Sequence, residues 1–231
     1  NVTDPELSFF TTDVSGISHY EVQIDEGVFV EQESPYQLPT LTEGEHNIVV
    51  RAYNTVGNYT DGIIDLTIDL TAPDPFTPQV DPGEITSNST PDLLYSTTDN
   101  VGISHYEVQV DSGDFSIQAS PYSVPTIPEG DHTLSVMAFD LAGNTTSGFA
   151  AATIDLSAPV ISFTSPTKLS NNPITDTTIN ITDDIAIETV GISSSGGAVD
   201  CTQTDSVTVD CSSVVTNSGT FTIYAYDVAG N

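Results

Sequence analysis

Positive charge is nearly absent from this sequence. Arg51 and Lys168 are the two basic residues, against 33 Asp and Glu, and the formal net charge is −31. Binding to a phosphate backbone requires clustered Lys and Arg, so the composition excludes a nucleic-acid partner, and an anionic lipid surface would repel the chain. The excess of carboxylates favours either solubility, through mutual repulsion or adaptation to salty water, or the binding of hard divalent cations.

Other side chains are scarce as well. Trp is absent and Met occurs once, although hydrophobic residues make up 37% of the 231 positions. There is no apolar run of the length that membrane insertion needs. No window repeats apolar residues at the helical spacing i, i+3, i+4, i+7, whereas Ser, Thr, Val and Ile are abundant, and β-branched residues favour half-buried strands. The composition predicts modest cores built from β-structure.

Cysteine is limited to Cys201 and Cys211, which lie ten positions apart in Thr- and Val-rich sequence. A metal site would need more ligands nearby, and a redox motif would need closer spacing, so the pair predicts a disulfide between neighbouring strands. A disulfide favours an oxidising compartment, and we expect the chain to be extracellular, either secreted or attached to a cell surface. Asn-x-Ser/Thr sequons occur at Asn1, Asn58, Asn88, Asn144 and Asn180, and the last four are the candidate glycosylation sites.

The sequence repeats itself. The stretch Asp13–Gln23 reappears at Asp99–Gln109, an offset of 99 − 13 = 86, and the match runs without a gap from Asp13 to Pro73. A third, more diverged copy shows Tyr224–Asn231 where the second has Met137–Asn144. Tandem copies of this size indicate an array of similar domains.

We predict three repeats: residues 1–70, which lack a first strand; residues 71–156, which are complete; and residues 157–231, which lack a last strand and contain the cysteines. Either the natural chain continues beyond both ends, or neighbouring chains supply the missing strands. The expected partners are adjoining repeats of the same chain, other copies in an assembly, or a host or surface glycan.

The second repeat shows the strand pattern of a sandwich. Leu134, Val136 and Ala138 alternate with polar residues, as do Tyr106 and Val108, so each set faces one side of a strand. Seven strands are predicted, at 76–80, 92–97, 104–110, 115–118, 121–124, 132–139 and 145–155. Seven short strands separated by regular turn signals predict an all-β, immunoglobulin-like or fibronectin III-like β-sandwich, repeated in an elongated tandem array.

Five segments of the second repeat carry a family resemblance: Tyr106–Gly113, Ser120–Tyr122, Glu129–His132, Ala138–Asn144 and Ile154–Pro159. Together they resemble the bacterial immunoglobulin-like and fibronectin type III-like repeats of large surface proteins and giant adhesins. The resemblance covers nearly the whole chain, and it implies extracellular tandem rods, often with calcium at the junctions. It is specific for the fold rather than for one function.

The predicted junctions concentrate acidic residues. In a seven-strand sandwich, the loop after the second strand and the loop before the last strand lie at the end where the chain enters. One junction would gather Asp69, Asp99, Asn100 and Asp140, and the next would gather Asp155, Asp183, Asp184 and Asp227. Carboxylates that converge there would repel one another, and a bound Ca²⁺ would remove the repulsion. The alternative is that these side chains cap turns by accepting bonds from their own backbone. The first repeat has Asn54 where Asp140 stands, which argues against a full metal site there.

The sequence contains no motif that would support an enzymatic activity. The sequence has no nucleophile elbow, no Cys near a His and no phosphate-binding Gly loop, so no catalytic residue is assigned. His46 and His132 recur at the repeat period and are predicted to fix a corner by hydrogen bonding to a neighbouring loop.

Three functions remain open at this point. The chain is a structural or adhesive spacer stiffened by Ca²⁺, or a subunit of an extracellular filament or surface layer, or a glycan-binding accessory module of a secreted polysaccharide-active enzyme. The third function needs exposed aromatic platforms, for which Tyr59 and Phe139 are the candidates.

Overall fold

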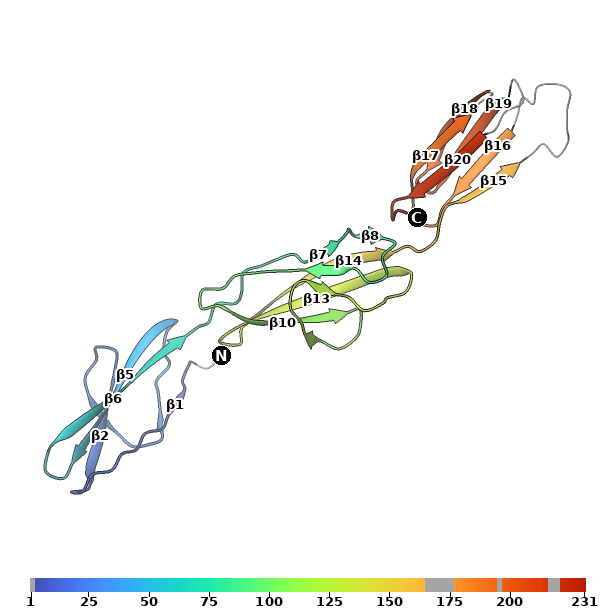
Figure 1. The fold of residues 1–231 in the computed structure, drawn as a ribbon. Coiled ribbons are helices and arrows are strands. Elements are labelled where there is room, and N and C mark those ends of the chain that lie inside the picture. Colours follow the sequence, from blue (N-terminus) through green and yellow to red (C-terminus); the bar gives the residue numbers. More distant parts are fainter. Residues whose placement is uncertain (1–2, 165–176, 195–196, 216–220) are drawn as a thin grey trace. The chain divides into compact units, whose positions relative to one another are not determined.

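The structure, a computed structural model, describes residues 3–164, 177–194, 197–215 and 221–231; Lys168 lies outside these ranges (Figure 1). The described residues form strands and no helix, so none of them belongs to a helix that could cross a membrane. The prediction of an all-β fold is confirmed.

Two sheets and one core form between residues 3 and 70. The strands are β1 (Glu6–Leu7), β2 (Ile17–Ile24), β3 (Val30–Gln32), β4 (Tyr36–Gln37), β5 (Gly44–Asn54) and β6 (Tyr59–Ile68). One sheet has the order β3-β2-β5-β6, and the other pairs β1 with β4. Leu7 and Leu38 from one side meet Val22, Ile48 and Ile68 from the other, and their burial holds the two sheets together.

Residues 76–154 form a more complete version of the same arrangement. The strands are β7 (Gln79–Asp81), β8 (Ile85–Thr86), β9 (Asp92–Leu94), β10 (Ile103–Val110), β11 (Ser116–Ile117), β12 (Tyr122–Ser123), β13 (Gly130–Asp140) and β14 (Thr145–Ile154). The sheets have the orders β11-β10-β13-β14-β8 and β12-β9-β7. Leu134, Val136 and Ala138 are fully buried, which confirms the predicted inward face of β13.

The predicted first strand at 76–80 is partly wrong. Pairing begins at Gln79 in β7, and a second short strand, β8, adds in parallel to β14, so this stretch has eight strands rather than seven. Pro73, Pro75 and Pro78 explain the late start, because a proline has no N–H to donate to a ladder.

The last group of strands encloses a third core. It comprises β15 (Val160–Thr164), β16 (Thr177–Thr182), β17 (Ile187–Ser194), β18 (Gly197–Asp205), β19 (Thr208–Val215) and β20 (Phe221–Asp227). The sheets have the orders β15-β16-β19-β18 and β17-β20, and Ile179, Ile181 and Val209 are buried between them.

By compactness the chain divides into two units. One contains residues 1–75, 97–105 and 137–146, and the other contains residues 76–96, 106–136 and 147–231. Both units draw on the predicted second repeat, so the boundaries at residues 70 and 156 stay a prediction. Each of the three cores, and each acidic site described below, belongs to a single unit.

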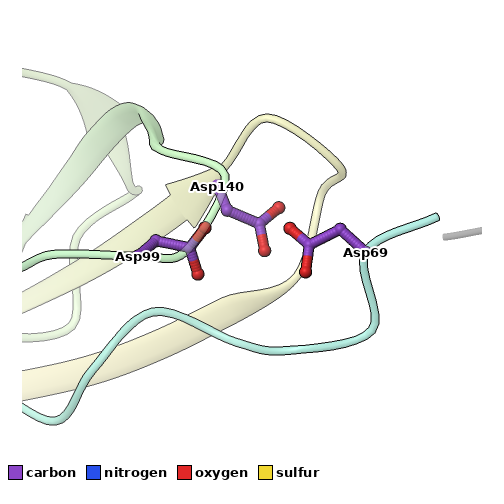
Figure 2. A group of neighbouring side chains, drawn as sticks. All are labelled: Asp69, Asp99 and Asp140. Atoms are coloured by element: carbon purple, nitrogen blue, oxygen red, sulfur yellow. The ribbon is translucent and has the colours of Figure 1, made fainter. Parts of the chain in front are cut away.

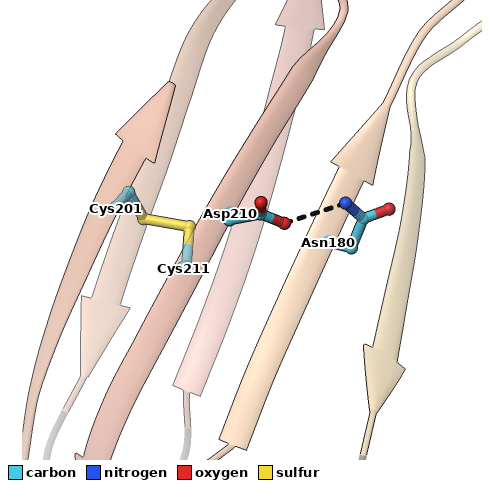
Figure 3. Close-up of a disulfide and its surroundings, with 4 residues drawn as sticks. All are labelled: Asn180, Cys201, Asp210 and Cys211. Carbon is cyan, nitrogen blue, oxygen red and sulfur yellow. Dashed lines mark hydrogen bonds between the residues drawn. A yellow bond between two sulfur atoms is a disulfide. The ribbon is translucent and has the colours of Figure 1, made fainter. Parts of the chain in front are cut away.

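The predicted disulfide is present. Cys201 on β18 and Cys211 on β19 are directly opposed in the strand register and are joined through their sulfur atoms (Figure 3). On the other side of β19, Asn180 of β16 donates to Asp210 at 2.9 Å (Figure 3). The bridge therefore links neighbouring strands of one sheet rather than the two sheets.

The repeated histidines fix corners, as predicted. His132 is buried and lies 2.8 Å from Asp111 Oδ2 through Nδ1 and 2.9 Å from the Pro128 carbonyl through Nε2. His46 makes the equivalent contacts with Asp25 and Thr42. Burial opposes protonation of His132, but its two hydrogen bonds outweigh this and raise its pKa.

Candidate metal centres

Three aspartates from separate segments converge in the first candidate centre. Asp69 directly follows β6, Asp99 lies in the loop before β10, and Asp140 ends β13. One carboxylate oxygen from each lies within 4.8 Å of those of the other two, and Figure 2 shows the three side chains pointing toward a common space. Asp69 and Asp140 are buried, at 3% and 2% exposure, so water screens their charges poorly.

Each aspartate also caps a turn with one oxygen. Asp69 Oδ1 accepts from Thr71 N at 3.1 Å, and Asp99 Oδ2 accepts from Val101 N at 2.9 Å. Asp140 Oδ1 accepts from Asn144 N at 2.8 Å. These bonds explain why the loops fold as they do, since Asp stabilises turns in this way.

Turn capping leaves one buried oxygen unexplained. Within the described part of the chain, no donor reaches Asp69 Oδ2, which is inaccessible to solvent. A buried, charged oxygen without a partner is costly, and such an atom calls for a donor or a cation. The capping hypothesis accounts for Asp69 Oδ1 and not for Oδ2.

Asn100 and Glu43 add further oxygens at this site. Asn100 Nδ2 faces Asp69 Oδ1 at 3.3 Å and Glu43 Oε1 at 3.5 Å. The opposite end of the Asn100 amide lies 3.2 Å from Asp99 Oδ1 and 3.3 Å from Oδ2. Whichever way the amide is turned, its oxygen faces carboxylate oxygens, an arrangement that a cation between them would make favourable.

Asn144 holds the segment that follows β6. Its Nδ2 lies 3.2 Å from the Asp69 carbonyl, 3.0 Å from the Thr71 carbonyl and 2.7 Å from Asp140 Oδ2. These contacts place the carboxylate of Asp69 against the loop that follows Asp140. The sequence analysis did not predict that Asn144 and Glu43 lie at this site. The Ala-Gly-Asn motif, which recurs in the repeats, was a signal that could have pointed to Asn144.

A second centre has the same construction. Asp155 follows β14 and Asp183 and Asp184 lie between β16 and β17, with one oxygen from each within 4.8 Å of the others. Asp155 Oδ1 accepts from Ser157 N at 3.0 Å, and Asp183 Oδ2 accepts from Ile185 N at 3.0 Å.

Three buried oxygens in this part of the chain lack a partner within the described residues: Asp155 Oδ2 and Asp183 Oδ1 of the group, and Asp227 Oδ2. Asp155 and Asp227 are fully buried. Burial, and then the charges of Asp227, Asp183 and Asp184, raise the pKa of Asp155. A carboxylate whose pKa rises in this way lacks compensating positive charge in its surroundings.

Asn231 takes the place of Asn144 at the second centre. Asn231 Nδ2 donates to the Asp155 carbonyl at 2.8 Å, and Asn231 N donates to Asp227 Oδ1 at 2.9 Å. Asp227 lies outside the 4.8 Å group, whereas Asp140 lies within the corresponding one. Carboxylates from corresponding segments thus gather twice in the chain, with Asp184 rather than Asp227 as the third member of the second group.

In the first repeat the corresponding residues form no such group. Asp13 is exposed and accepts from Ser15, and Asn54 Oδ1 accepts from Val56 N and Asn58 N. Asn54 therefore caps its turn as Asp140 does, but without the second negative oxygen.

The candidate glycan platforms are already in contact with neighbours. Phe139 stacks on His105 at 4.5 Å between ring centroids. Tyr59 is 58% exposed, and the guanidinium of Arg51 lies 4.1 Å from its ring centroid. Of the glycosylation candidates, Asn58 and Asn88 are exposed, while Asn144 and Asn180 use their side-chain nitrogens in the hydrogen bonds given above.

Comparison with known proteins gives distant similarities of fold. No family matches the sequence, and no curated protein is similar to it. The fibronectin(III)-like modules of Clostridium thermocellum CbhA share 17% identity over 66% of this chain and 85% of theirs, with a TM-score of 0.45. The chain also aligns with SGBP-B of the Bacteroides ovatus mixed-linkage glucan utilization locus, solved with a mixed-linkage heptasaccharide (17% identity, 99% of this chain, 59% of that one, TM-score 0.26). The protocadherin fragment PcdhgB3 EC1-4 shares 10% identity over 97% of this chain and 68% of its own, with a TM-score of 0.30. Similarities this distant carry no argument about function.

Proposed function

We propose that this chain is a non-catalytic, extracellular structural spacer whose successive repeats are clamped together by Ca²⁺. The observation that carries the proposal is the pair of equivalent acidic centres with buried, unpartnered carboxylate oxygens. The disulfide supports the extracellular setting, because such bonds persist in oxidising compartments.

The donor set favours a hard divalent cation. Both groups offer carboxylate oxygens, and the first adds the Asn100 amide, while no His or Cys belongs to either. Ca²⁺ accepts six to eight oxygen ligands in flexible geometry, whereas Mg²⁺ demands a near-ideal octahedron and keeps its waters. A site assembled from loops of different segments suits the more tolerant ion.

The ion would act as a clamp. At the first centre it would bind Asp69, which follows β6, to the loops that carry Asp99 and Asp140. At the second it would bind Asp155, which follows β14, to the loop with Asp183 and Asp184. Because each centre joins the segment after one repeat to loops of the next, its occupancy would restrict bending there.

The test is calcium binding by the full chain. Isothermal titration after chelation should reveal two Ca²⁺ sites, and Asp69→Asn should remove one of them. Asp114→Asn, which makes the same charge change at an exposed residue, is the matched control and should keep both. The proposal fails if the wild-type chain shows no saturable Ca²⁺ binding, or if both variants lose the same amount.

Small-angle scattering then tests the spacer function separately. The maximum dimension should be longer and better defined with Ca²⁺ than with chelator. If Ca²⁺ binds but the scattering curve does not change, the two binding sites are supported and the proposal that they stiffen the chain is wrong.

A further inference from the structure

The two acidic centres are built on matching backbone frames. Asp99 Oδ2 accepts from the backbone N–H groups two and three residues later, at 2.9 and 3.0 Å, and Asp183 Oδ2 accepts from the same relative positions at 3.0 and 3.1 Å. A backbone hydrogen bond then ties each loop to the residue after Asp140 or Asp227, at 3.1 and 3.0 Å respectively. Because the frames agree, a difference between the centres must come from the side chains that they carry.

A glutamate lies beside each centre in the same way. Glu43 directly precedes β5 and accepts from Thr71 Oγ1, while Glu129 directly precedes β13 and accepts from Ser157 Oγ at 3.0 Å. Both hydroxyls lie two residues after the buried aspartate of their centre. The two centres therefore share this acid, and it does not distinguish them.

One position differs in charge between the centres. The residue after the capping aspartate is Asn100 in the first centre and Asp184 in the second, and both side chains are exposed. An oxygen of Asp184 belongs to the group of three within 4.8 Å, whereas Asn100 brings a neutral amide to within 3.3 Å of Asp69 Oδ1. The first centre thus has three aspartates and the second has four: Asp69, Asp99 and Asp140 against Asp155, Asp183, Asp184 and Asp227.

The extra charge favours the second centre as a Ca²⁺ site. Repulsion among the carboxylates is present before an ion arrives, so it does not oppose binding, whereas the attraction of the cation increases with each added carboxylate. Asp184 is exposed, so an ion recruits it at little cost in desolvation. Both centres contain a buried oxygen that no donor among the described residues reaches, Asp69 Oδ2 and Asp155 Oδ2, so each has an atom that calls for a cation.

We propose that the second centre binds Ca²⁺ at least about tenfold more tightly than the first, and that the residue after the capping aspartate sets this order. The order of filling rests on the proposed function, since it concerns the same two clamps. It makes the two junctions respond to different calcium concentrations. Between the two dissociation constants, the segment after β14 is clamped while the segment after β6 is not.

Isothermal titration of the chelated full chain with Ca²⁺, at constant ionic strength, tests this order. Wild type should show two saturable steps whose Kd values differ at least about tenfold, and Asp69→Asn should remove the weaker step. Asp184→Asn should weaken the tighter step by about tenfold or more, and Asn100→Asp should tighten the weaker step by a similar factor. The chain that carries both changes should fill its first centre first, so that adding Asp69→Asn to it removes the tighter step.

Matched controls make the same charge changes away from the centres. Asp200→Asn is an exposed change on β18, and Asn58→Asp is an exposed change in the turn at the opposite end of β6 from Asp69. Both should leave the two Kd values as in wild type. If they shift the Kd values as much as the variants at Asn100 and Asp184 do, net charge rather than the centre sets the affinity, and the proposed order is wrong.

The remaining outcomes separate the order of filling from the clamps themselves. No saturable Ca²⁺ binding in wild type would reject the proposed function and the order of filling with it. Two steps of equal affinity would overturn the order alone, as would a Kd that either Asn100→Asp or Asp184→Asn leaves unchanged. Loss of the tighter step in Asp69→Asn on the wild-type background would show that the first centre fills first, which also overturns it.

Discussion

Replacing Asp155 by Asn should stabilise the protein in chelator and destabilise it, relative to wild type, in calcium. The pKa of Asp155 is raised by burial and by its acidic neighbours, so the ionised side chain is unfavourable when no cation is present. Asn keeps the oxygen that accepts from Ser157 N and puts a neutral amide where Oδ2 has no partner.

The size of the effect follows from the geometry. At 4.8 Å, two unit charges repel by about 1 kcal/mol in water and by about 3.5 kcal/mol at an effective dielectric constant of 20. Asp183 is half-buried and Asp184 is exposed, so the lower figure applies, and the variant should gain about 1–2 kcal/mol in chelator. Wild type should gain about 2.7 kcal/mol when Ca²⁺ is at 100 times its Kd, whereas the variant should gain much less. The order of stabilities therefore reverses between the two conditions.

Thermal unfolding with chelator and with saturating Ca²⁺ measures this reversal. A change of 1 kcal/mol moves the midpoint by about 4–8 °C for a domain of this size. Asp200→Asn, an exposed change in the same repeat, should show no reversal. If Asp155→Asn is destabilised in both conditions, or if Ca²⁺ raises the midpoint of wild type and variant equally, the reasoning about this centre is wrong.

Three further predictions concern the fold. His132 has a raised pKa and Asp111 a lowered one, so their contact stabilises the protein fully between about pH 4 and pH 6.5; it is lost as pH rises through the raised pKa of His132, or falls through that of Asp111. Urea unfolding should therefore show a larger loss for His132→Gln at pH 5.5 than at pH 8.5. Reduction of the disulfide should cost about 2–3 kcal/mol, the entropy of a ten-residue loop, visible as a lower midpoint for the third repeat alone. Gly148→Ala should destabilise the second repeat by about 1–3 kcal/mol because its Cβ would collide with Phe76 and Pro78, whereas Gly62→Ala should be nearly neutral; equal effects would show that the segment around Phe76 yields easily.

The local sequence pattern was sufficient to predict much of the fold. The alternation of Leu134, Val136 and Ala138 identified an inward strand face, because side chains in a strand have a period of two. The spacing of Cys201 and Cys211 identified their bridge, because a short β-hairpin brings such positions opposite each other. The aspartates that meet at each centre were also predictable, since the internal repeat and the sandwich topology place their loops at one end.

Other features depend on which residues meet in space rather than on neighbours in sequence, and these were decided by the tertiary structure. No pattern indicated that Glu43 and Asn144 approach the first centre, or that Asp227 stands farther from its group than Asp140 does, because these distances depend on how separate loops pack. The sequence by itself determined which faces are apolar and which loops are acidic. Burial and the pairing of polar atoms are properties of the folded chain, so only the structure could show which carboxylate oxygens of the described residues lack a partner.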